Sequence, residues 1–170
     1  MSVSYLFSKS KTNKIGSRAI SYFTNFLVPD LNPCSHVAIK VNDLVFESTL
    51  TSGVRIVLYD NWIKTNTVVY TVNCVDKIDH YVVLKKAMDI TYDKKYDWMG
   101  ILYFAKCIIS KLLFDIDIPK VNKWQSEQRY FCVELIESIT GKKYSMITPI
   151  QLVSEWKDSG REVIEFNDIN

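Results

Sequence analysis

The stretch SHVAIKVNDLVFESTLTSGVRI, residues 35–56, decides the fold of this chain. Apolar side chains alternate at Val37, Ile39 and Val41, which is the pattern of a half-buried strand. Asn42-Asp43 predicts a tight turn, after which Leu44 to Ser48 continues as the second strand of a hairpin. Another apolar run closes the stretch, so these residues predict part of an antiparallel sheet.

Patterns on either side extend this sheet and add helices. Short apolar runs predict strands, and apolar residues repeated every three or four positions predict helices. The expected strands are 3–7, 53–59, 68–72 and 161–166, and the expected helices are 15–27, 78–88, 98–114, 128–140 and 148–160. Most strands precede residue 75 and most helices follow it. This order predicts one α+β domain over residues 1–170, with a mainly antiparallel sheet packed against helices.

Two helix ends carry characteristic boundary residues. Gly141 is expected to stop the helix before it, because glycine adopts the left-handed conformation of a helix end without steric cost. Thr148 is expected to cap the next helix, with Pro149 at the first helical position.

Composition and charge exclude several classes of protein. The chain has 170 residues, of which 48% are hydrophobic and 24% charged, the balance of a globular domain rather than a disordered one. The net charge is 21 − 19 = +2, which gives no argument for a nucleic-acid partner. The four cysteines form no CxxC pair and no cluster with histidine, so we expect no metal site.

Targeting features are equally sparse. The first residues contain no apolar segment typical of a secretory signal, so we expect a cytoplasmic protein with free thiols. The longest apolar stretch, 98–114, is interrupted by Lys106 and Lys111. A spanning helix needs about 20 apolar residues, so no transmembrane segment is expected.

Three residues are candidates for chemistry. Cys132 lies near the start of a predicted helix, where unpaired N–H groups and the helix dipole favour a thiolate. His36 opens a strand directly after a loop, a place where folds present functional groups. The turn at 42–43 pairs residues whose numbers sum to about 85, which places Glu47 opposite Ala38 and one diagonal step from His36. A carboxylate there would orient the imidazole.

Each candidate also has a simpler interpretation. Free cysteines are usually buried small hydrophobes, and we expect that role for Cys34, Cys74 and Cys107. His80 is expected on an exposed helix face. A core histidine and a solvated strand glutamate remain alternatives for His36 and Glu47.

The same residues resemble a known family, the circularly permuted NlpC-type papain-like cysteine hydrolases. This family includes YiiX-like proteins, poxvirus relatives and, more distantly, lecithin retinol acyltransferase relatives. The matching pattern is Ser35-His36 at a strand start, then Phe46-Glu47-Ser48-Thr49, then Gly53-Val54. Tyr96-Asp97-Trp98 before Gly100, and Tyr130-Phe131-Cys132-Val133-Glu134-Leu135, match in the same order. Val133 departs from the serine that the family often has.

The resemblance covers roughly residues 4–155 and implies a papain-like fold. It implies that Cys132 is the nucleophile, His36 the general base and Glu47 the orienting residue, with no cofactor. It also implies a peptide or acyl substrate. The substrate would be a peptide, of the peptidoglycan type or another kind, or a lipid acyl group. A phage or bacterial source would fit a peptidoglycan substrate. An inert peptide- or lipid-binding module is the third alternative.

Overall fold

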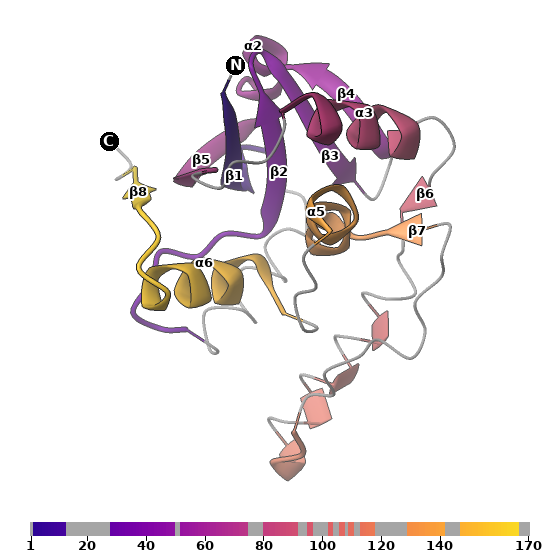
Figure 1. Cartoon of the computed structure of the whole chain (residues 1–170). Helices are drawn as coiled ribbons and strands as arrows, with labels where there is room; N and C mark the ends of the chain where they lie inside the picture. The colour runs from indigo at the N-terminus through magenta and orange to yellow at the C-terminus, as the bar shows by residue number, and fades with distance from the viewer. Residues whose placement is uncertain are drawn as a thin grey trace.

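The computed structural model describes residues 2–12, 28–49, 52–74, 80–91, 95–96, 102–103, 106–107, 109–110, 113–117, 129–141 and 147–166. Six strands form one antiparallel sheet, in the order β4-β3-β2-β1-β5-β8 (Figure 1). The strands are β1 (Val3–Ser10), β2 (His36–Val41), β3 (Leu44–Thr49), β4 (Gly53–Leu58), β5 (Asn66–Asn73) and β8 (Val163–Glu165). The predicted α+β class with a mainly antiparallel sheet is therefore confirmed.

The hairpin of β2 and β3 has the predicted register. Ile39 pairs with Phe46 and Val41 with Leu44, so paired residue numbers sum to 85. Asn42 takes a positive φ of 50° in the turn, a conformation that asparagine tolerates better than most residues. The predicted turn therefore sets which side chains of β2 and β3 share a face.

Within the described residues, four helices pack against the sheet or its ends. They are α2 (Tyr59–Trp62), α3 (His80–Thr91), α5 (Cys132–Thr140) and α6 (Pro149–Asp158). Helix α5 lies against β2 and β3, and α3 lies against α5 and β4 (Figure 1). A separate two-residue parallel pair, β6 (Lys95–Tyr96) with β7 (Arg129–Tyr130), leads directly into α5.

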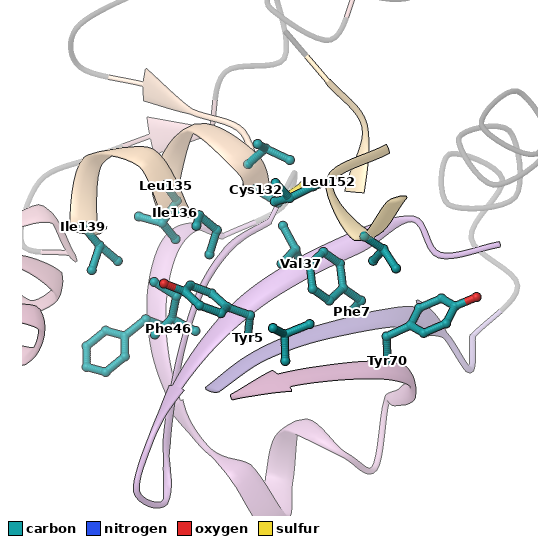
Figure 2. Packing of buried hydrophobic residues seen from close by; sticks show 14 of the residues in the cluster. Tyr5, Phe7, Val37, Phe46, Tyr70, Cys132, Leu135, Ile136, Ile139 and Leu152 are labelled. Carbon is teal, nitrogen blue, oxygen red and sulfur yellow. The ribbon is translucent and has the colours of Figure 1, made fainter. Parts of the chain in front are cut away.

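The core divides between the two faces of the sheet because side chains alternate along each strand. On one face, Tyr5, Phe7 and Phe46 meet α5 and α6 (Figure 2). The helical side chains in this cluster include Leu135, Ile136, Ile139, Leu152 and Trp156. On the other face a smaller cluster contains Leu6, Ala38, Val45 and Trp62. The sheet is thus buried on both sides where β1, β2 and β3 meet.

Several boundaries differ from the sequence-based expectation. The strand expected over 53–59 ends at Leu58, and the unpredicted α2 starts at Tyr59. A four-residue helix contains barely one turn, too little for a periodic pattern. The two-residue strands β6 and β7 were not expected for the same reason. The strand expected over 161–166 shortens to Val163–Glu165, and it closes the sheet beside β5.

Two expected helices fall wholly or largely outside the described residues. The helix expected over 15–27 lies outside them. Within 98–114, the described residues 102–103, 106–107, 109–110 and 113–114 are helical. Among the described residues, no helix has both the length and the hydropathy that crossing a membrane requires.

Both predicted helix-end residues take their expected roles. Gly141 follows α5 with a φ of 72°, and its N–H donates to the carbonyl of Glu137. Thr148 Oγ1 accepts from the backbone N–H of Gln151, and the Gln151 side chain accepts from the N–H of Thr148. This reciprocal capping satisfies two backbone donors at the start of α6.

We expect Thr148→Ala to lower the free energy of unfolding by about 1 kcal/mol, because it removes the N-cap of α6. Thr148→Ser keeps the capping oxygen and should retain most of the stability. Ser154→Ala, within α6, is the matched control and should change little. Urea denaturation measures all three variants, and equal losses in Thr148→Ala and Ser154→Ala would contradict a capping role.

Candidate active site

The candidate nucleophile, Cys132, is the first residue of α5. The preceding residue, Phe131, has an extended backbone, and its N–H donates to Glu134 Oε2 at 3.1 Å. This bond fixes the point at which the chain enters the helix. Cys132 is only 6% exposed and belongs to the larger core cluster, near Leu152 and Val37 (Figure 2). The helix therefore holds the sulfur atom in place at its N-terminal end.

The candidate base, His36, is the first residue of β2. The ladder between β2 and β3 runs only from Val41↔Leu44 to Ile39↔Phe46, so it stops before His36 reaches a partner. Nε2 of His36 donates to Glu47 Oε2 at 2.8 Å. Because Nε2 is engaged by the carboxylate, Nδ1 is the ring nitrogen available to Cys132.

The carboxylate of Glu47 is buried, with 1% of the side chain exposed. Oε2 accepts from His36 Nε2 and from Trp62 Nε1, each at 2.8 Å. Oε1 accepts from Arg55, whose Nε lies 2.7 Å away and whose Nη2 forms an ion pair with the same oxygen. A carboxylate offers about four acceptor positions, so every position on Glu47 is occupied.

The surroundings of His36 favour the imidazolium form. Burial opposes a charge on the ring, but hydrogen bonds to the Cys132 and Glu47 side chains, with the negative charges of both, outweigh it. Together they raise the pKa of His36 from 6.5 to about 10. A pKa raised on folding adds stability that is complete below pH 6.5 and disappears as pH rises through about 10.

The surroundings of Glu47 favour the carboxylate form. Burial alone would raise its pKa, but the bonds from His36, Trp62 and Arg55 lower it from 4.5 to about 2. A pKa lowered on folding adds stability that is complete above pH 4.5 and disappears as pH falls through about 2. The two groups therefore support each other most fully between about pH 4.5 and 6.5.

The structure brings together the three candidate residues that were predicted from the sequence. Cys132 comes from a helix, His36 from the start of one strand and Glu47 from the next strand. The other described thiols have different surroundings from Cys132. Burial, and then the negative charge of Cys132, raise the pKa of the Cys34 thiol, which keeps that thiol protonated. Cys107 is buried and Cys74 is half-buried, with its Sγ 3.8 Å from the Tyr5 hydroxyl.

Two residues of the site, Arg55 and Trp62, were not predicted. The position of Arg55 follows from the register between β3 and β4. If Gly53 pairs with Thr49 across the second turn, Arg55 must pair with Glu47, as the structure shows. The sequence gives no such indication for Trp62, because it is the last residue of a short helix, α2, whose position depends on tertiary packing.

No family model, curated protein or solved structure matches this chain. Among the described residues, no group of three or more His, Cys, Asp and Glu side chains is arranged to hold a metal ion.

Replacing Cys132 should lower the pKa of His36. Cys132→Ala removes both the hydrogen bond and the negative charge that favour the imidazolium, so the ring should titrate below the wild-type value of about 10. Proton NMR can follow the ring directly, because the chain has only two histidines and His80→Gln assigns the signals. Cys74→Ala, a thiol elsewhere in the fold, should leave the titration unchanged. An unchanged curve in Cys132→Ala would mean that the two side chains are not coupled.

Proposed function

We propose that this chain is a thiol hydrolase that cleaves an amide or ester bond through Cys132, His36 and Glu47. The observation that supports it best is the unbroken chain of side-chain contacts from the Cys132 sulfur through His36 to a buried, ionised Glu47. A nucleophile, a base and an orienting acid in this order are the parts that covalent acyl transfer needs.

The resemblance to the permuted NlpC-type papain-like hydrolases supports the same proposal. Its separate sequence pieces lie near one another in the fold. Tyr96, from the second piece, pairs with Tyr130, from the third, immediately before Cys132. The pieces bearing His36 and Glu47 form adjacent strands. This proximity is what a shared site requires, and on it we base the proposed papain-like architecture.

The proposed reaction begins with attack of the Cys132 thiolate on the substrate carbonyl carbon. The resulting oxyanion would be held in part by the backbone N–H of Cys132 at the start of α5. His36 then gives the proton on Nδ1 to the leaving group, the carbon–nitrogen or carbon–oxygen bond breaks, and a thioester remains. Neutral His36 next takes a proton from water, the water oxygen attacks the thioester, and the thiolate is regenerated.

Glu47 has a supporting role in this scheme. Its pKa of about 2 means that it does not take the proton from His36 at neutral pH. It holds the ring by Nε2 and stabilises the imidazolium that is present before acylation and forms again during deacylation. We propose a peptide or amide as the substrate, of the peptidoglycan type or another peptide.

One observation favours a second candidate, a lipid acyl hydrolase or acyltransferase. Large apolar side chains are exposed in the segment 102–116, with Phe114 71% and Leu113 69% exposed. Such side chains suit contact with a lipid surface. Parallel assays on peptide amides and on phospholipid vesicles would separate the two candidates.

Cys132→Ala should abolish turnover while the fold is retained, because the sulfur acts in the transition state. His36→Ala should lose a similar factor, since members of a catalytic unit do not contribute additively. Glu47→Gln should be milder, because an amide oxygen still accepts from Nε2 but carries no charge. The measurement is kcat/KM on a substrate that the wild type cleaves, with circular dichroism confirming folding. Full activity in Cys132→Ala would rule out the assignment.

Alkylation tests the inert-module alternative without a known substrate. A thiol beside a general base reacts faster with an alkylating reagent than a thiol without one. Iodoacetamide should therefore label Cys132 faster than Cys74, and His36→Ala should remove that difference. Mass spectrometry at each cysteine measures the labelling rates in wild type and in His36→Ala. Uniform slow labelling of both thiols in the wild type would favour a module without catalytic chemistry.

A further inference from the structure

Arg55 contacts the site through a carboxylate rather than through a reacting atom. It sits on β4 directly opposite Glu47 on β3, and both Nε and Nη2 reach Oε1. His36 reaches the other oxygen, Oε2. One carboxylate thus lies between two cationic groups, which are separated by only two hydrogen bonds.

This placement joins four groups in a row. They are the Cys132 side chain, the His36 imidazolium, the Glu47 carboxylate and the Arg55 guanidinium, and the last three alternate in charge. The positive charge of Arg55 offsets part of the negative potential that Glu47 produces at His36. Charge–charge interactions in a partly buried site are strong enough for this sharing to matter. Arg55 therefore weakens the hold of Glu47 on the imidazolium proton while it fixes the carboxylate in position.

We propose that Arg55 is a positioning residue that also moderates the basicity of His36, so that the imidazolium can release its proton to the leaving group. The proton transfer to a leaving group rests on the proposed function, whereas the effect of Arg55 on the pKa of His36 does not. A general acid works best when its proton affinity matches the working pH. With the full charge of Glu47 on one side and a thiolate on the other, His36 would retain its proton too strongly.

Three neighbouring elements each present a different group to His36. Helix α5 contributes Cys132, and β3 contributes Glu47. Strand β1 places Ser8 directly across from His36, and its buried Oγ has no hydrogen-bond partner among the described residues. Ser8 carries no charge. Arg55 is therefore the cation whose removal should change the field at Glu47 most directly.

Trp62 helps to make the inference testable. Its indole N–H donates to Oε2, the same oxygen that His36 contacts, and helps to orient the carboxylate. Trp62 lies in the smaller apolar cluster, on the face of the sheet opposite to the larger one. Glu47 therefore remains held by His36 and Trp62 when Arg55 is replaced. The Arg55 side chain is 40% exposed, so a polar substitute has room and solvent.

The experiment is an NMR titration of the His36 ring in wild type, Arg55→Gln and Glu47→Gln. Arg55→Gln should raise the pKa of His36 by roughly half a unit to one unit, because the counter-charge is lost. Glu47→Gln should lower it. General loosening of the site would instead move both variants downward, toward the ordinary value of 6.5. An unchanged or lowered pKa in Arg55→Gln would overturn the inference.

Two controls separate charge from packing. Lys40→Met removes a cation from the same strand as His36, one that lies over the Tyr59 ring and not on Glu47. Ser8→Ala alters the packing beside the ring without changing any charge. Both should leave the pKa of His36 within about 0.2 units of wild type, because the charge of Lys40 is separated from Glu47 and screened, and Ser8 carries no charge. An equal rise in either control would also overturn the role of Arg55.

A further variant, Arg55→Lys, keeps the test possible if Arg55→Gln does not fold. Arg55→Lys keeps the charge but loses the two-pronged contact, so the pKa of His36 should stay near the wild-type value. A rise as large as that expected for Arg55→Gln would contradict charge sharing. None of these titrations needs a substrate. A failed inference would therefore appear in them, whereas a failed hydrolase assignment would appear as activity retained in Cys132→Ala.

Discussion

The buried carboxylate of Glu47 is the constraint on which the rest of the site depends. An ionised carboxylate inside a protein is costly unless donors surround it, because burial removes its hydration. Here four contacts from three side chains replace that hydration, and the pKa of Glu47 falls to about 2. Removing any one donor would leave a buried acceptor partly unsatisfied. The positions of His36, Arg55 and Trp62 are therefore tied to one another through a single group.

This constraint explains why the sheet and the short helix α2 belong to the site as much as α5 does. The two hairpins bring β2, β3 and β4 side by side, so His36, Glu47 and Arg55 come from consecutive strands. Helix α2 directly follows β4 and places the indole N–H of Trp62 within hydrogen-bond distance of the same carboxylate. Only the sulfur of Cys132 comes from the distant half of the chain. A large apolar cluster holds α5 and α6 against the sheet.

The larger apolar cluster sets the geometry, and the polar chain supplies the chemistry. Leu135, Ile136 and Ile139 fix the position of α5 over the sheet, which in turn fixes where its first residue lies (Figure 2). Burial of these side chains contributes on the order of 1.5–3 kcal/mol each. A polar contact such as that between His36 and Cys132 contributes less to stability, but it helps to raise the pKa of His36.

The sequence by itself determined the local features of this protein. Alternating apolar residues and the Asn42-Asp43 turn settled the central hairpin and its register, and therefore the closeness of His36 and Glu47. Gly141 and Thr148 marked helix ends because capping depends on neighbours only a few residues away. Only the tertiary structure decided the contact between Cys132 and His36, the place of Trp62 and the full set of donors on Glu47. Those contacts join segments far apart in the chain, and their geometry depends on how the helices pack on the sheet, which no local pattern encodes.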